Sequence, residues 1–242
     1  MTYKTISYAE SQVGKYIDLN GDGIPEGVIF ADLAIGGSGQ WGKHPHHNDF
    51  CQYKIPTIKE FKDYIIVGEY EDKINGKQEV LAPVLDGMDR FYVMALSDVV
   101  LKRRYFTWYD AAFFHEDGIF AYQVIAKPDF GTGKQNTLNM INKWNSKEYG
   151  EQNTCEDHTD MWNEIQDEVN NGWFVPSRAE WAAFGDSLKL TKDNYSTKGF
   201  KWYYWSSSLF NSHSAYFAYF SNGFIDSNII ICDYSIRLAT TI

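Results

Sequence analysis

The stretch GWFVPSRAEW, residues 172–181, decides the fold of this chain. Within it, Ser177 and Glu180 form an S-x-x-E capping box, in which each side chain satisfies a backbone amide at the start of a helix. We therefore predict that a helix begins at Ser177. The apolar residues that follow recur at helical spacing and form one apolar face, made of Trp181, Phe184 and Leu188.

Two further helices are predicted before this stretch. Residues 131–150 carry one apolar stripe, and residues 160–170 carry a second that ends at an Asn-Gly pair, a common helix stop. The stripes comprise Leu138, Ile141 and Trp144 in the first segment and Met161, Ile165 and Val169 in the second. Residues 104–113 fit a strand or a helix, and the alanines after Thr107 favour the helix.

Predicted strands lie on both sides of this helical region. Residues 28–30 are apolar and follow a Gly- and Pro-rich corner, residues 91–96 form a β-branched and aromatic run, and short aromatic strands begin near residue 201. Residues 36–49, GGSGQWGKHPHHND, are predicted to be a loop. The order of strands, helices and strands is typical of an α+β fold, and no linker divides residues 1–242 into two domains.

Composition excludes several classes of protein. The 242 residues carry a net charge of −10, and Lys102–Arg104 is the only basic cluster, which argues against a nucleic-acid partner. No run of about 20 apolar residues is present, so no membrane span is expected, and the first residues contain no apolar signal-peptide core. The aromatic content of 17% suits a binding surface as well as a core.

The segment DLNGDGIPE, residues 18–26, resembles the first half of a calcium loop. Asp18, Asn20 and Asp22 occupy ligand positions, whereas the position that normally supplies a bidentate glutamate is Ile29. A tight corner built from Asx and Gly residues explains the same pattern without an ion. Calcium is therefore an open candidate, and no other cofactor is expected.

Other chemical motifs are weak. The group His44, His46, His47 and Cys51 contains zinc-binding residue types but lacks a second ligand group at suitable spacing. The segment GTGKQNT, residues 131–137, lacks phosphate-loop spacing and is better explained as a glycine turn that leads into a helix. No nucleophile elbow or paired catalytic carboxylate stands out, so the residues make no positive case for an enzyme.

The C-terminal segment has an unusual composition. From Ser206 to Ile242 it contains no Lys, Gln, Glu, Trp or Met, although these five types make up roughly a fifth of the chain. None of the five can be reached from the Asn codons AAC and AAT by replacing either adenine. The absence of these five residue types therefore indicates adenine-directed mutagenesis of an Asn-rich template. The alternative is an ordinary polar and aromatic region of strands and turns.

Four motifs together resemble the variable proteins of diversity-generating retroelements: GWFVPSRAEW (172–181), WSSS (205–208), FSNGFIDS (220–227) and SIRLA (235–239). Upstream segments that look similar to gut-bacterial and phage members are residues 16–42, 89–98 and 107–113. The resemblance spans nearly the whole chain. In that family a template repeat is copied with corrupted adenines, and the copy replaces the 3′ end of the gene.

The resemblance implies a C-type lectin fold, in the branch shared with formylglycine-generating-enzyme-like domains. We expect mixed, mainly antiparallel short strands, two to three helices and long loops. Trp205 and the following serines would belong to the scaffold, residues 236–238 to the last core strand, and residues 201–242 would carry the variable ligand-binding region. The expected binding residues are Phe210, Asn211, Ser212, His213, Ser214, Tyr216, Phe217, Tyr219, Ser221, Asn222, Phe224, Asp226, Asn228, Ile229, Ile230, Ile231, Cys232, Asp233 and Tyr234.

The resemblance predicts a non-catalytic binder whose ligand is a protein or a glycan, including one on a host cell surface. An enzyme of the formylglycine-generating-like branch is the first alternative, but no cysteine pair lies near the C-terminal site. A virion or adhesin component with a fixed partner is the second. The lack of Glu-Pro-Asn and Trp-Asn-Asp triplets argues against calcium-dependent sugar binding of the animal-lectin type. The expected location is a phage virion or the cytoplasm, with surface display by another route left open.

Overall fold

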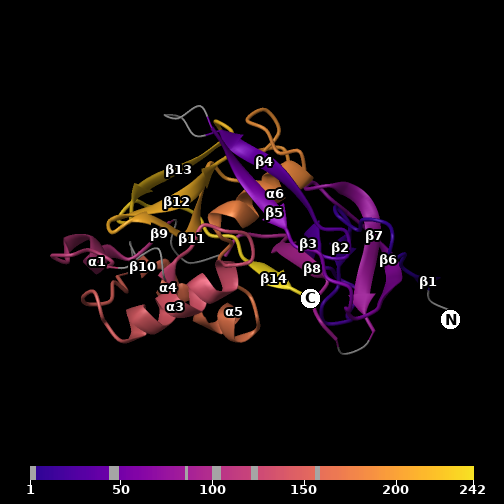
Figure 1. Ribbon diagram of the computed structural model, residues 1–242, viewed down its shortest axis with the longest axis horizontal. Helices are drawn as coiled ribbons and strands as arrows, with labels where there is room; N and C mark the ends of the chain where they lie inside the picture. The colour runs from indigo at the N-terminus through magenta and orange to yellow at the C-terminus, as the bar shows by residue number, and fades with distance from the viewer. Residues whose placement is uncertain (1–3, 44–48, 85–86, 100–104, 121–124, 156–158) are drawn as a thin grey trace.

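The computed structural model describes residues 4–43, 49–84, 87–99, 105–120, 125–155 and 159–242. It is a mixed α+β structure with many short strands and few helices, as predicted (Figure 1). The strands are β1 (Lys4–Thr5), β2 (Tyr16–Ile17), β3 (Gly27–Asp32), β4 (Gly37–Lys43), β5 (Phe50–Ile55), β6 (Tyr64–Asp72), β7 (Gly76–Pro83), β8 (Phe91–Ala95), β9 (Phe106–Thr107), β10 (Thr159–Asp160), β11 (Tyr203–Asn211), β12 (Ser214–Tyr219), β13 (Phe224–Ile229) and β14 (Ala239–Thr241). The helices are α1 (Asp110–Phe114), α3 (Gly133–Asn145), α4 (Met161–Glu164), α5 (Gln166–Asn170) and α6 (Arg178–Ser187).

A seven-stranded sheet forms the N-terminal half of the molecule. Its order is β1-β6-β7-β2-β3-β8-β14, and its pairs are antiparallel except for β2 with β7. Every residue of β3 is buried, because both faces of this strand are covered. Val28 and Phe30 pack in the core that contains α6, whereas Ile29 packs with Phe91 and Val93 on the opposite face.

A buried ion pair joins two strands of this sheet. The Arg90 guanidinium donates through Nε to Asp32 Oδ1 and through Nη2 to Asp32 Oδ2, both at 2.8 Å. Both side chains are almost fully shielded from solvent. The Asp32 carboxylate also accepts the backbone amides of Gln12 and Ala34, so the buried charge is fully hydrogen-bonded.

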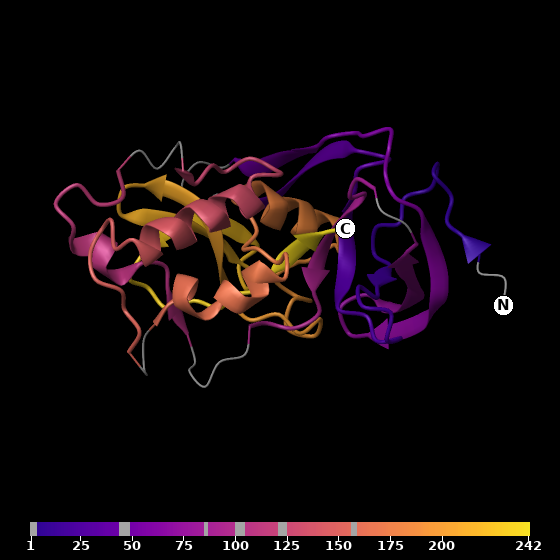
Figure 2. The ribbon, with the colours of Figure 1, turned by 90° about the horizontal axis from the view of Figure 1, so that it is seen from below.

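A three-stranded antiparallel sheet, β11-β12-β13, lies at the other end of the molecule (Figure 1). One face packs on α6, where Tyr204, Ala218 and Ile225 share a core with Trp181. The other face carries Trp205 and packs against a second core that includes residues of α3 and α4. Figure 2 shows these pink and orange helices lying over the yellow strands.

Strand β14 returns the C-terminus to the first sheet. It pairs with β8, and the Ile242 carbonyl accepts the amides of Arg90 and Phe91 at 2.7 and 2.8 Å. The expected core strand at residues 236–238 therefore lies three residues later. Residues 236–238 are buried but irregular, because Arg237 turns inward, donates to Asp98 at 2.7 Å and lies 4.3 Å from the Phe200 ring.

The helix predicted from the capping box is confirmed in detail. Ser177 Oγ accepts the Glu180 amide, and Glu180 Oε2 accepts the Ser177 amide at 2.6 Å. The helix predicted over residues 160–170 is divided into α4 and α5, because the backbone leaves helical geometry at Ile165. With the short α1, which begins inside the segment 104–113, the described helices outnumber the two to three expected.

Two details of the predicted pattern are wrong. Residues 36–49 contain β4, which pairs with β5 and holds the Trp41 ring against Phe220. Its glycines suggest a loop, but they permit close packing: a Cβ at Gly39 would lie 2.4 Å from the Tyr53 hydroxyl. In α3, Leu138 is exposed, because the spacing i, i+3, i+6 drifts off one helical face, and Met140 is buried instead.

Candidate functional site

The expected binding residues gather around the β11–β13 sheet and the turns beside it. All but three of them are at least partly exposed, and the alternating scaffold residues are buried. Phe210, Asn222 and Ile229 are the most exposed of the set. The buried positions between them include Ala215, Ala218, Phe220 and Ile225, which hold the sheet on its two cores.

Three expected binding residues are buried and need correction: Phe217, Ile230 and Tyr234. Ile230 sits in the second core because its backbone is fixed on both sides. Its amide donates to the His213 carbonyl, and its carbonyl accepts the Trp108 amide at 2.8 Å. Of the three consecutive isoleucines, Ile229 is exposed, Ile230 is fully buried and Ile231 is half-buried.

Tyr234 covers the sheet from the loop that follows β13. Its ring lies 4.8 Å from Tyr203 and 4.5 Å from Trp205, and its hydroxyl accepts a 2.6 Å hydrogen bond from Asn228. Burial raises the pKa of Tyr234 to about 12, against a smaller opposing effect of that hydrogen bond. Phe217 is buried beneath the same ring, at 4.7 Å. Tyr234 and Phe217 therefore support the face rather than form its outer surface.

The exposed residues occupy both sides of the outer strand β13. Strand register places Tyr219 opposite Phe224 on one side, and Ser214 opposite Ile229 on the other. On this second side the Arg178 guanidinium lies 4.7 Å from the centre of the Tyr216 ring. The face thus combines aromatic and aliphatic side chains with small polar ones.

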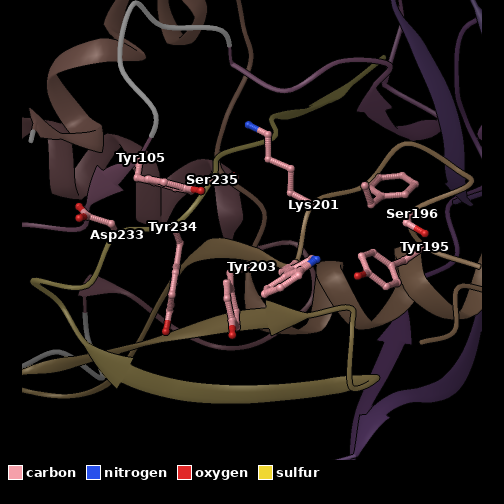
Figure 3. Close-up of a pocket in the computed structure, with 10 residues that line it drawn as sticks. Tyr105, Tyr195, Ser196, Lys201, Tyr203, Asp233, Tyr234 and Ser235 are labelled. Atoms are coloured by element: carbon pink, nitrogen blue, oxygen red, sulfur yellow. The ribbon is translucent and has the colours of Figure 1, made fainter. Parts of the chain in front are cut away.

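An aromatic pocket of about 590 Å³ opens beside this sheet (Figure 3). We use the name aromatic pocket for the cavity lined by Tyr105, Tyr195, Ser196, Phe200, Lys201, Trp202, Tyr203, Asp233, Tyr234 and Ser235. In Figure 3 the rings of Tyr203 and Tyr234 run side by side, with Asp233 beyond one and Tyr195 beyond the other. Among these residues, only Asp233 and Tyr234 belong to the binding set expected from the sequence.

The sequence contained a signal for the missed part of the pocket. Residues 200–205 read FKWYYW, the densest aromatic run in the chain. Trp205 and Tyr204 of this run are buried, whereas Trp202 is 60% exposed. A tryptophan that remains so exposed at the mouth of a cavity indicates a contact surface.

The pocket tyrosine Tyr203 shares a hydrogen bond with Tyr219, which lies outside the pocket lining. Burial and, next, the hydrogen bond to Tyr219 raise the pKa of Tyr203 to about 12. The same bond lowers the pKa of Tyr219. The two rings are 4.4 Å apart, so this side of the pocket is held rigidly before any ligand binds.

The corner at residues 18–26 brings three carboxylates together. Oxygens of Asp18, Asp22 and Glu26 lie within 4.8 Å of one another. Asp18 accepts the amides of Gly21 and Gly23, and Asn20 Oδ1 accepts the Asp22 amide, as in an Asx-rich turn. Burial raises the pKa of Glu26, with smaller contributions from the two aspartates. Glu26, at loop position nine, thus lies beside the two aspartates, and calcium at this corner stays a prediction.

The remaining motifs have ordinary structural roles or cannot be placed. His44, His46 and His47 of the zinc candidate, and the cluster Lys102–Arg104, lie outside the described residues, while Cys51 is buried. The glycine turn at residues 131–133 does lead into α3. Its Gly131 and Gly133 amides donate to Glu180 Oε1, so a carboxylate of the protein occupies the position that a phosphate would take.

The cysteines do not form an activated thiol pair. All three lie within the described residues as thiols. Burial raises the pKa of Cys51. Burial and the neighbouring Asp233 raise the pKa of Cys232, which keeps both thiols protonated near neutral pH.

Comparison with known proteins adds little. No protein-family model matches the chain, and no curated protein matches it. Among solved structures, a fimbrial protein from Bacteroides ovatus is similar at a TM-score of 0.42 and 16% identity, over 63% of this chain and 36% of that one. The chain thus spans about a third of that protein, and a likeness of this degree supports no statement about function. In the described ranges, no helix combines the length and apolarity needed to cross a membrane.

Proposed function

We propose that this chain is a non-catalytic ligand-binding protein with a C-type lectin fold, whose C-terminal face is diversified by a diversity-generating retroelement. The motifs at residues 172–181 and 205–208 carry the resemblance to that family. The first includes the start of α6, which packs on the β11–β13 sheet, and the second lies within β11. The face built on this sheet is the proposed binding surface.

One observation carries the proposal: exposure alternates with burial along the segment that lacks Lys, Gln, Glu, Trp and Met. Most residues expected to vary reach the surface, while Ala218, Phe220 and Ile225 between them are buried. A segment of this kind can change its surface without changing its core. Phe217 and Ile230 are excluded from the proposed contact surface, and Tyr234 reaches it only as a wall of the aromatic pocket.

The chemistry of the face suits recognition of many ligands. Rigid rings such as Phe210 and Phe224 supply contact area at little entropic cost, and residues such as Asn222 supply adaptable hydrogen bonds. Burying the exposed part of Ile229, 38% of the residue, against a ligand would contribute about 1 kcal/mol at most. The half-buried Cys232, with its raised pKa, fits a contact residue better than a nucleophile.

The decisive test is genomic. We expect a near-copy of the sequence encoding the C-terminal segment beside the gene, together with a reverse transcriptase. Mismatches between the two copies should fall at template adenines. A missing copy, or mismatches spread over all four bases, would refute diversification.

A fixed-partner adhesin or virion component would share this surface but not its variation. Sequencing the gene across a population separates the two, because a fixed partner requires an invariant face. An enzyme would lose activity when Cys155 and Cys232 are replaced by Ser, so retention of any detected activity in that variant would exclude these thiols as its source.

A further inference from the structure

The aromatic pocket joins two parts of the chain with different origins. Lys201 and Trp202 are residue types that adenine substitution in Asn codons cannot produce, and they precede the segment that lacks such types. Asp233 lies inside that segment. If the proposed function holds, every natural variant therefore shares the first part of the pocket and differs in the second.

The pocket offers stacking surfaces that are already in place. The Tyr203 and Tyr234 rings are stacked at an interplanar angle of 21°, and hydrogen bonds from Asn228 and to Tyr219 hold their hydroxyls. At the mouth, Trp202 and Tyr105 are 60% and 47% exposed. Binding there would bury apolar ring surface without first reordering the walls.

The charges of the lining argue for a neutral ligand. Lys201 and Asp233 are the charged side chains that line the pocket, and they have opposite signs. Lys201 Nζ lies 3.3 Å from Asp98, outside the lining, which holds the ammonium near the rim. A cationic ligand would be attracted by Asp233 but repelled by Lys201, and the reverse holds for an anionic ligand, so each carries one electrostatic penalty and no clear net gain. A ligand with both hydroxyl donors and acceptors, and no net charge, meets neither penalty.

Ring stacking together with polar pairing selects one chemical class. We propose that the aromatic pocket binds a neutral pyranose unit of a glycan, with an apolar C–H face of the sugar against Trp202 and its hydroxyls toward Asp233, Ser196 and Lys201. The volume of about 590 Å³ lies in the range of small-molecule sites. This inference rests on the proposed function, because it treats the C-terminal face as a ligand-binding surface.

The experiment uses the full chain and a panel of methyl glycosides of glucose, galactose, mannose and N-acetylglucosamine, followed by their oligosaccharides. Binding is measured by saturation-transfer NMR and by titration calorimetry. We expect at least one neutral pyranoside to bind, Trp202→Ala to weaken it at least tenfold, and Trp202→Phe to restore part of the affinity. The matched control is Phe120→Ala, which removes a ring of similar exposure, 68%, outside the pocket lining and should leave affinity unchanged.

Three outcomes would overturn the inference. The first is no binding of any neutral sugar at tens of millimolar, and the second is unchanged affinity in Trp202→Ala. The third is binding of choline or trimethyl-lysine in place of sugars, which would make the pocket a cation cage. Unfolding curves of both alanine variants exclude loss of fold as the cause. If the pocket binds no sugar, the genome can still contain the template repeat. The binding result therefore tests the pocket separately from the proposed function.

Discussion

The rings of Tyr203 and Tyr234 stack at 4.8 Å, and this contact joins the first strand of the C-terminal sheet to the loop after the last. Tyr234 also touches Trp205 and Phe217. The contact closes the sheet over the second core and at the same time forms a wall of the aromatic pocket. Tyr234 therefore belongs both to the second core and to the pocket lining.

Replacing Tyr234 with Ala should lower the free energy of unfolding by about 3–5 kcal/mol, as for other buried aromatic rings. Tyr234→Phe keeps the ring and loses only the hydrogen bond from Asn228, so it should cost about 1 kcal/mol. Urea unfolding followed by tryptophan fluorescence measures both. Asn222→Ala, at an exposed turn, should stay within about 0.5 kcal/mol. Equal losses in Tyr234→Ala and Asn222→Ala would contradict the assigned role.

The buried Glu180 should make stability depend on pH. Burial raises its folded-state pKa to about 7 from a usual value of 4.5, against the opposing backbone hydrogen bonds. The folded protein then holds this proton more tightly than the unfolded chain does. Stability from this group is fully present below pH 4.5 and decreases as pH rises to about 7, by up to ~3 kcal/mol.

The measurement is the unfolding free energy at several pH values in the wild type and in Glu180→Gln. The variant cannot titrate at this position, so its stability should fall less steeply between pH 5 and 7. It should also be less stable at every pH, because its amide group sets a donor against the donors of Ser177 or Gly131. Parallel pH profiles would show that Glu180 keeps one protonation state.

The Arg90–Asp32 pair should be costly to break from one side. Arg90→Met leaves a buried carboxylate with only the amides of Gln12 and Ala34, and we expect a loss of about 3–5 kcal/mol. Adding Asp32→Asn removes the stranded charge and should recover part of that loss. A double-mutant cycle from urea unfolding measures the coupling, and additive losses would contradict it. The control, Lys77→Met, breaks an exposed pair with Glu69 and should leave the free energy of unfolding nearly unchanged.

The calcium prediction for residues 18–26 has a direct test in thermal unfolding with calcium or with a chelator. If the corner binds calcium with the affinity of extracellular modules, 10 mM should stabilise the wild type by about 1–3 kcal/mol. Asp22→Asn removes one charge but keeps an oxygen to accept the Ile24 amide, so it should retain the corner and lose the response. Identical melting with calcium and chelator would leave only the Asx-turn explanation.

Short sequence patterns predicted the helices and strands that depend on residues close together in the chain. The capping box at Ser177 placed the start of α6, and the apolar run at residues 91–96 placed β8 (Phe91–Ala95). Strand β4 was missed because its glycines are required by neighbours far along the chain, Tyr53 beside Gly39 and Ile225 beside Gly42. No local pattern contains that information.

The candidate site was likewise predicted only in part from the sequence. Codon composition pointed to residues 206–242, and the structure brings most of that set around one sheet. It could not reveal that Ile230 is buried, because burial there comes from its backbone bonds with His213 and Trp108. It also could not reveal the fixed wall of the aromatic pocket, since Tyr105 and Tyr195 reach it only through the fold.

Strand β14 makes the first sheet depend on the last residues of the sequence. It is the last strand, it pairs with one edge of β8, and Ile242 directly after it accepts the amides of Arg90 and Phe91. A protein that stops or shifts frame anywhere inside residues 206–238 lacks β14 and leaves the edge of the first sheet open. We expect such a product to be less stable than the full-length chain, so the integrity of the first sheet depends on the reading frame of residues 206–238.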